Sequence, residues 1–301
     1  MELTELKKYE PIYVIGHINI DTDSAVASKI LCDILNDFGV KAYYAILDEK
    51  YTFDEYNAGM VKECMDFNPV IIKKEEVNKY NWFLVDHNDR HQSVGLEANV
   101  LGAIDHHPYA NNVNNVEITD VCSTALHIFN KYKDKYNFTK EQKYQIYMAF
   151  LNDSTFGKSS RYKDSDEEIA KQLGFEYDYN ELFKKFFVTT DISQGVHTKM
   201  KNGQKKYQFD NVYFESNYIE QFGIEQLNEY KKIVNNLESF LGVWVDYENE
   251  KTYAYFKYDG ELIEYKYDFI ASRATTILND VIKYLKERNY IEDNETNLKR
   301  R

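Results

Sequence analysis

Residues 13–39 read YVIGHINIDTDSAVASKILCDILNDFG and open a repeating strand–loop–helix pattern. The apolar run Tyr13–Gly16 is typical of a buried strand, and a polar loop follows it from His17. Apolar residues then recur three and four positions apart, which predicts a helix with one buried face: Ala27, Ile30, Leu31, Ile34, Leu35 and Phe38. Gly39 follows as a helix stop.

The same alternation continues through the first half of the chain. Three further apolar runs are typical of buried strands: 40–47, 82–85 and 100–104. Helical patterns follow at three places: 122–133, 139–152 and 164–174. Strands that alternate with helices indicate β-α-β units, so we predict an α/β domain with a parallel sheet over residues 1–187.

The second half has a different pattern, and we predict a smaller mixed α/β domain over residues 197–301. The segment 188–196 shows little periodicity and is predicted to be a linker. A strand pair is expected around 205–215, and two aromatic-rich strands at 242–247 and 252–258. Two helices are expected in this half: 224–240 and 273–288.

Composition excludes several classes of protein. The 301 residues include 37 basic and 50 acidic side chains, a net charge of −13. Such a chain is not expected to bind nucleic acid or acidic membranes, because both need a basic surface. No run approaches the ~20 apolar residues of a transmembrane helix. Three scattered cysteines and a polar amino terminus predict a cytoplasmic protein without disulfides or a signal peptide.

Histidine and aspartate gather where the predicted strands of the first domain end. Three apolar runs end alike, in VIGH-INIDTD, FLVDHND and GAIDHH. Because carboxyl ends of neighbouring parallel strands face one crevice, these side chains are expected to converge there. The apolar stretch 148–151 is expected to bring a further acid, Asp153, to the same place. The expected cluster is His17, Asp21, Asp23, Asp86, His106 and Asp153.

The chemistry of this cluster predicts a metal centre. Four carboxylates packed together repel one another, and cations relieve that repulsion. Nitrogen and oxygen donors without sulfur suit Mn²⁺, Mg²⁺ or Fe²⁺ better than structural zinc. Six donors can hold two metals if carboxylates bridge them, the arrangement of two-metal phosphoryl hydrolases.

At these residues the sequence resembles the DHH phosphoesterase superfamily, and within it the manganese-dependent (family II) inorganic pyrophosphatases and related exopolyphosphatases. Five segments carry the resemblance, in order along the first domain: GHINIDTDS (16–24), LVDHNDRHQS (84–93), IDHHPYANN (104–112), CSTALHIFN (122–130) and NDSTFGKSS (152–160).

The resemblance implies two divalent metal ions, preferably Mn²⁺, with Mg²⁺ or Co²⁺ as alternatives. One metal would be held by His17, Asp21, Asp86 and Asp153. The other would be held by Asp23, Asp86, His106 and Asp153, so that Asp86 and Asp153 bridge. His107 would face the phosphate of the substrate, and His87 would support the site from behind.

The resemblance also implies that the second domain closes over an interdomain cleft and supplies cations to the substrate. Lys205 or Lys206 is the expected lysine after a turn, and Arg273 belongs to a late Ser-Arg-Lys signature. Here Ala274 replaces the lysine of that signature, which puts strict pyrophosphate specificity in question. Asp86, His107 and Arg273 are the expected catalytic residues.

Other candidate residues are expected to be structural. His127 lies on the apolar side of a helical pattern and is predicted to pack in the core. His91 is expected to be exposed and His197 to be structural. The cysteines Cys32, Cys64 and Cys122 are expected to be small core residues.

We therefore predict a metal-dependent phosphoanhydride hydrolase acting on a small anionic phosphate, with pyrophosphate first and polyphosphate as the alternative. Related phosphodiesterases carry adjacent glycines in the second domain, and no two glycines are adjacent here. A regulatory module would lack some ligands, yet all those expected are present. The resemblance leaves a homodimer open, since relatives pair through strands of the first domain.

Overall fold

The computed structural model describes residues 3–18, 20–48, 68–159, 161–176, 195–200, 204–221, 223–292 and 299–300. It divides into two compact units. The first contains Met1–Gly157 and Tyr162–Leu182, and the second contains Lys158–Arg161 and Phe183–Arg301. Cys64 and most of the predicted linker, 188–196, lie outside the described residues.

The first unit is built on a six-stranded sheet in which all described pairs are parallel. In spatial order its strands are β3 (Val70–Ile72), β2 (Ala42–Leu47), β1 (Ile12–Ile15), β4 (Asn81–Val85), β5 (Asn99–Asp105) and β6 (Val116–Ile118). Its helices are α1 (Thr22–Asp37), α3 (Thr124–Tyr132), α4 (Lys140–Asp153) and α5 (Asp164–Lys171), with short 3-10 turns η1 (Leu3–Tyr9), η2 (Lys74–Lys79) and η3 (Arg90–Gln92). The predicted α/β fold with a parallel sheet is confirmed.

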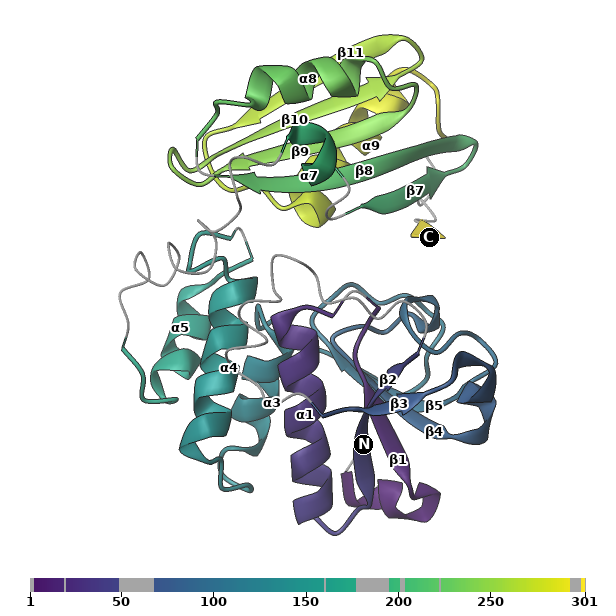
Figure 1. Ribbon diagram of the computed structural model, residues 1–301, viewed down its shortest axis with the longest axis vertical. Helices are drawn as coiled ribbons and strands as arrows, with labels where there is room; N and C mark the ends of the chain where they lie inside the picture. The colour runs from purple at the N-terminus through teal and green to yellow at the C-terminus, as the bar shows by residue number, and fades with distance from the viewer. Residues whose placement is uncertain are drawn as a thin grey trace. The chain divides into compact units, whose positions relative to one another are not determined.

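Alternate residues of each strand pack against different layers. Helices α1, α3 and α4 lie together on one side of the strands (Figure 1). The other face packs against η2 and the loops after β4 and β5, around a cluster that includes Trp82, Leu84 and Val94. Successive strands are added on both sides of β1, with β2 on one side and β4 on the other. In parallel sheets, a crevice forms at the carboxyl ends of the strands where the strand order changes direction in this way.

The second unit has a mixed six-stranded sheet, antiparallel except for the pair β8–β9. In spatial order its strands are β11 (Glu261–Tyr267), β10 (Lys251–Tyr258), β9 (Phe240–Asp246), β8 (Val212–Gln221), β7 (Lys205–Phe209) and β12 (Lys299–Arg300). Its helices are α7 (Val196–Lys199), α8 (Leu227–Asn235) and α9 (Leu278–Glu287), and α9 follows a π turn, η4 (Arg273–Ile277).

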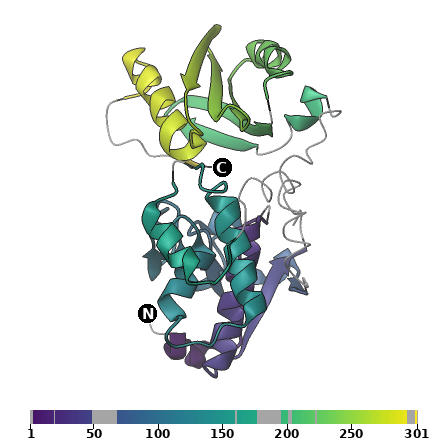
Figure 2. The ribbon, with the colours of Figure 1, turned by 90° about the vertical axis from the view of Figure 1, so that its left-hand side faces the viewer.

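Helices α8 and α9 cover opposite faces of this sheet (Figure 2). On one face Trp244 and Tyr255 pack with Tyr230 of α8. On the other face Phe256 packs against Phe214 of the sheet and Tyr284 of α9. The mixed α/β character predicted for this half of the chain is confirmed.

The structure corrects the helix predicted at 224–240, because α8 ends at Asn235 and β9 begins at Phe240. All seven residues of β9 are buried, so the apolar run after the helix belongs to a central strand. The helix predicted at 273–288 is the π turn η4 followed by α9. Four strands were not predicted, and each lies at an edge of its sheet: β3, β6, β11 and β12.

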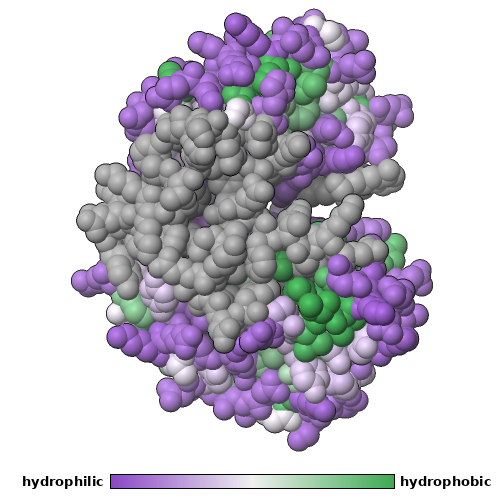
Figure 3. Space-filling model, in the orientation of Figure 1, coloured by the Kyte–Doolittle hydropathy of each residue, from purple (hydrophilic) through white to green (hydrophobic). Residues whose placement is uncertain are grey.

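The coloured surfaces in Figure 3 are largely hydrophilic, with a hydrophobic patch on the first unit. Exposed large apolar residues include Ile71 on the edge strand β3, with 65% of its surface accessible. In the described ranges, every helix is too short or too polar to span a lipid bilayer.

Candidate metal centre

The predicted donors stand at the carboxyl ends of three strands and at the ends of two helices. His17, Asp86 and His106 follow β1, β4 and β5. Asp21 caps α1 by accepting a hydrogen bond from the Ser24 backbone (2.8 Å), and Asp23 lies in the first turn of the same helix. Asp153 is the last residue of α4. The fold therefore brings the ends of three strands and two helices of the first unit to one place.

Gly16 allows β1 and the start of α1 to approach closely. A side-chain carbon at position 16 would lie 1.9 Å from Ser24 Oγ, so another residue fits there only if the Ser24 hydroxyl moves away. The hydroxyl of Ser24 accepts a hydrogen bond from the backbone of His17 (3.1 Å). This close approach holds the imidazole of His17 beside the carboxylates at the start of α1.

The buried carboxylate of Asp86 is the centre of the cluster. His17 Nε2 lies 3.3 Å from Asp86 Oδ2, and His106 Nε2 lies 3.2 Å from Asp86 Oδ1. His17 Nε2 is also 3.3 Å from Asp21 Oδ2, and His106 Nε2 is 3.4 Å from Asp153 Oδ2. Asp86 adopts a left-handed backbone conformation (φ 59°), a strained geometry that occurs often at functional sites.

Three overlapping sets of donor atoms, each within 4.8 Å, can be defined around Asp86. They are His17 with Asp21 and Asp86; Asp23 with Asp86, His106 and Asp153; and Asp86 with Asp105, His106 and His107. The first two sets contain all six predicted metal ligands. Asp153 belongs to the second set, so its predicted bridge to His17 and Asp21 stays a prediction.

The donor set fits divalent cations. Asp86 Oδ2 is buried and has no hydrogen-bond partner among the residues that the structure describes, although His17 Nε2 lies nearby. His17 Nδ1 lies 2.9 Å from the carbonyl of Ile18, which leaves Nε2 directed at the carboxylates. Imidazole nitrogens and carboxylate oxygens without sulfur match the preferences of Mn²⁺ and similar ions.

The amino terminus of α3 holds Asp23 in place. Ser123 Oγ and the backbone N–H of Ala125 donate to Asp23 Oδ1 (2.7 and 2.9 Å), and the backbone N–H of Thr124 donates to Oδ2 (2.7 Å). Because a carboxylate oxygen has two lone pairs, Oδ2 keeps one for a metal ion. The hydroxyl of Thr124 also lies 3.2 Å from Asp86 Oδ1.

Burial and charge shift the pKa values of the cluster in opposite directions. Burial, followed by the charge of Asp86, raises the pKa of Asp23 to about 7. Burial alone would lower the pKa of His17, but Asp21 and Asp86 outweigh it and raise that pKa well above 6.5. Burial opposes ionisation of Asp86, yet contacts with His106 and His17 hold its pKa well below 3.8. Without a metal, protons therefore supply part of the missing positive charge.

His87 lies beside His17 and belongs to none of the donor sets defined above. Its ring is buried, with Nδ1 2.8 Å from the carbonyl of Val85 and Nε2 2.6 Å from Ser93 Oγ. The imidazole rings of His17 and His87 pack edge to face, with their centroids 6.3 Å apart. Because both ring nitrogens of His87 face hydrogen-bond partners, neither is directed at a metal ion, and the ring packs beside His17.

His107 lies at the rim of the cluster and is oriented by Asp105. Its Nδ1 is 2.9 Å from Asp105 Oδ1, which leaves Nε2 as the nitrogen available to a ligand. Burial and the neighbouring His106 lower the pKa of His107 to about 4. Asp105, Ser123 and Thr124 were not predicted as site residues. The sequence could have indicated them, because Asp105 directly precedes two histidines and the pair Ser123–Thr124 starts a helical pattern.

The three candidate substrate residues of the second half lie in the second unit. Lys205 and Lys206 begin β7 and are exposed. Arg273 is largely buried at the start of η4, where its guanidinium lies over the ring of Tyr218 (5.6 Å) and Nη1 donates to Ser216 Oγ (3.1 Å).

Other predictions for single residues have mixed outcomes. Cys32 and Cys122 are buried, and His91 is exposed, as expected. His127 was predicted to pack in the core, but its Nε2 lies 2.8 Å from Glu117 Oε1 at a partly exposed position. The apolar pattern of α3 hid this contact, because Glu117 belongs to the separate edge strand β6.

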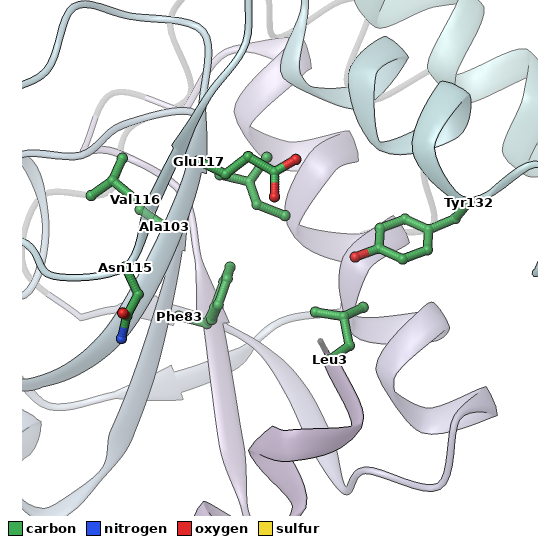
Figure 4. Close-up of a pocket in the computed structure, with 8 residues that line it drawn as sticks. Leu3, Phe83, Ala103, Asn115, Val116, Glu117 and Tyr132 are labelled. Carbon is green, nitrogen blue, oxygen red and sulfur yellow. The ribbon is translucent and has the colours of Figure 1, made fainter. Parts of the chain in front are cut away.

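A cavity of about 120 Å³ lies between the sheet and the helices of the first unit (Figure 4). Its labelled walls include Phe83 from the sheet and Leu3 and Tyr132 from η1 and α3, with Glu117 beside them. None of its lining residues belongs to the donor sets, so this cavity is separate from the cluster around Asp86.

Parts of the chain are similar in sequence to known proteins. Residues 11–152 match the family model described as the DHH family, N-terminal domain. The manganese-dependent inorganic pyrophosphatase of Bacillus subtilis (strain 168) is 29% identical over 171 residues, which cover 54% of this chain and 54% of that protein. The enzyme of the same name from Methanothrix thermoacetophila is 28% identical over 170 residues, 54% and 53% of the two chains. The chain thus spans about half the length of these curated relatives in the match.

Two solved structures share the fold over nearly the whole chain. A Methanococcus jannaschii protein provisionally assigned as a family II inorganic pyrophosphatase superimposes with a TM-score of 0.72 at 19% identity, covering 90% of this chain and 98% of that one. An exopolyphosphatase-related protein from Bacteroides fragilis gives 0.52 at 14% identity, with 95% of each chain covered. Residues 11–152 of this chain are therefore similar to the DHH family N-terminal domain, and the chain shares the α/β fold of both solved structures.

Proposed function

We propose that the chain is a metal-dependent hydrolase of phosphoanhydride bonds, with inorganic pyrophosphate as the leading substrate. The observation that carries this proposal is the convergence of five imidazole and carboxylate donors around a sixth, the buried Asp86. The match to manganese-dependent inorganic pyrophosphatases covers 54% of the chain and supports the same chemistry. A homodimer, which the resemblance leaves open, and a cytoplasmic location, which the sequence predicts, both stay untested.

In this proposal two donor sets each hold one divalent cation, preferably Mn²⁺. His17 and Asp21 serve one ion, and Asp23, His106 and Asp153 serve the other, while Asp86 is common to both sets. When bound, a pair of such ions lowers the pKa of a shared water and polarises phosphoryl oxygens. Asp86 lies between the two imidazoles, with His17 Nε2 3.3 Å from Oδ2 and His106 Nε2 3.2 Å from Oδ1, so both Nε2 atoms face the same carboxylate.

His107 is proposed to contact a phosphoryl oxygen of the substrate through Nε2. Its Nδ1 is held by Asp105, so the ring cannot turn without losing that contact. In the free protein its pKa near 4 keeps the ring neutral at pH 7. An anionic phosphate beside the ring favours the protonated form, so the ring gains a charge that stabilises the developing anion.

The pairing of β7 with β8 favours Lys205 over Lys206 as the substrate lysine. Lys205 stands opposite Ser216, whose hydroxyl accepts from Arg273, and residues directly opposite in an antiparallel pair share one face. Lys206 stands opposite Glu215 on the other face and forms an ion pair with it (3.3 Å). Lys205 and Arg273 therefore present their charges on the same face of the second sheet.

A panel of metals and substrates tests the proposal. Purified protein with Mn²⁺ should release orthophosphate from pyrophosphate, and chelation should abolish the release. Mg²⁺ and Co²⁺ should support weaker activity. An exposed-histidine variant, His91→Asn, is the control and should keep full activity. Turnover of a linear dinucleotide, with none on pyrophosphate or tripolyphosphate, would overturn the proposal in favour of a phosphodiesterase.

Inorganic polyphosphate is the second candidate substrate, and Ala274 favours it. The resemblance predicts a lysine at this position, and its absence removes one charge-assisted contact of about 1.5–3 kcal/mol to a small substrate. A longer chain of phosphates can make up for that contact elsewhere. The ratio of tripolyphosphate to pyrophosphate turnover in the same panel separates the two candidates.

A further inference from the structure

Two asparagines join the loops that follow β4 and β5. Asn88 lies in the first loop, and Asn112 lies in the second. Each side chain bonds to groups of the opposite loop. Of the two asparagines, only Asn88 bonds to Asp105, the residue that orients His107, and His107 is the proposed substrate contact.

The amide of Asn88 is buried, with 1% of the residue exposed, and both of its ends are used. Nδ2 donates to Asp105 Oδ2 (2.5 Å) and to the carbonyl of Pro108 (3.1 Å). Oδ1 accepts from the backbone N–H of Ala110 (2.6 Å). The side chain therefore fixes both the carboxylate and the backbone of the second loop.

Asp105 is completely buried, and its two oxygens have different partners. Oδ1 accepts from the backbone N–H groups of His106 (2.7 Å) and His107 (3.0 Å) and lies 2.9 Å from His107 Nδ1. Oδ2 accepts from Asn88. Without the amide of Asn88, Oδ2 would lose a hydrogen bond in a buried place, and the carboxylate would turn to replace it. Such a turn would release the ring of His107.

We propose that Asn88 is a positioning residue, which fixes Asp105 and through it the orientation of the His107 ring. The inference rests on the proposed function for the role of His107 toward substrate, whereas the hydrogen-bonded series Asn88–Asp105–His107 is independent of it. A small misplacement of a group that contacts the reacting phosphate costs rate more than binding.

Asn112 provides a matched comparison within the same pair of loops. Its Nδ2 donates to Asp89 Oδ1 (2.6 Å), and its Oδ1 accepts from the backbone N–H of Arg90 (3.0 Å). These bonds also join the two loops, but they touch neither Asp105 nor His107. Asn112→Ala therefore removes a similar link between the loops without releasing the ring.

Kinetics on single and double variants provides the first test. Asn88→Ala should lower kcat about tenfold or more, with KM and Mn²⁺ affinity changed less than about threefold. Asn112→Ala should lower kcat less than about threefold. In a His107→Ala background, Asn88→Ala should cause no further loss of kcat, because the group it positions is gone. If the losses of the two single variants multiply in the double variant, Asn88 does not act through His107 and the proposal is overturned.

Nitrogen NMR of metal-free protein with labelled histidine provides a readout that does not depend on activity. In the wild type and Asn112→Ala, the His107 signals should show one tautomer with the proton on Nδ1. In Asn88→Ala they should shift toward a mixture of tautomers. Unchanged signals would overturn the proposal. If the signals change but the wild type hydrolyses no phosphoanhydride, the proposed function fails and the positioning role stands. Asn88→Ser, which keeps a hydroxyl for hydrogen bonding, replaces Asn88→Ala if thermal unfolding shows that the latter does not fold.

Discussion

Adding Mn²⁺ to the metal-free protein at pH 7 should release more than about 0.5 protons for each chain. A metal ion needs ionised carboxylates and neutral imidazoles, so the protons that the free cluster holds must leave when the metal binds. Asp23, with a pKa of about 7, is about half protonated at pH 7. The raised pKa of His17 adds to this number, because its ring holds more proton at pH 7 than an ordinary imidazole does.

The same two groups predict how the stability of the metal-free protein changes with pH. Each binds its proton more tightly in the folded protein than in the unfolded chain, so stability falls as pH rises. For Asp23 the fall extends from its ordinary value of 3.8 to about 7 and amounts to about 4 kcal/mol at most. For His17 it extends from 6.5 to its higher folded value. Asp86 acts oppositely, and its contribution is lost only in stronger acid.

Titration calorimetry in two buffers of different ionisation enthalpy counts the released protons directly. At saturating Mn²⁺, His17→Asn should lower the count to about 0.5, and the exposed control His91→Asn should leave it unchanged. Thermal unfolding from pH 6 to 8 should show falling stability only in the metal-free protein. A release of fewer than about 0.5 protons by the wild type at pH 7 would refute the reasoning, since the cluster would not then hold the expected protons.

Three substitutions test the proposed roles of single residues. Asp86→Asn should lower kcat about a thousandfold or more at saturating Mn²⁺, measured as orthophosphate release, because both donor sets lose their common carboxylate; retained turnover would contradict the shared role. Lys205→Ala should raise KM for pyrophosphate about tenfold and Lys206→Ala less than threefold, and the reverse order would assign the contact to the other face. Ala274→Lys should raise pyrophosphate turnover relative to tripolyphosphate about tenfold, whereas an unchanged ratio would place residue 274 away from substrate.

The sequence by itself determined the types of element in the first half and the chemistry of its polar residues. Apolar spacing is a local property, so the strand at 13–16 and the helix face from Ala27 to Phe38 could be predicted from neighbouring residues. Apolar runs that end in histidine and aspartate indicated candidate metal ligands at the carboxyl ends of parallel strands. The structure places these side chains within reach of one another, and their roles as ligands stay a proposal.

Only the tertiary structure decided which distant groups complete the cluster. Asp23 is held by the start of α3, about a hundred residues further along the chain, and Asp105 orients His107 while bonding to Asn88 in another loop. The faces of Lys205 and Lys206 likewise follow from the register of β7 with β8. Such contacts depend on strand order and register, which are set by packing between remote segments and leave little trace in the spacing of residues along any one of them.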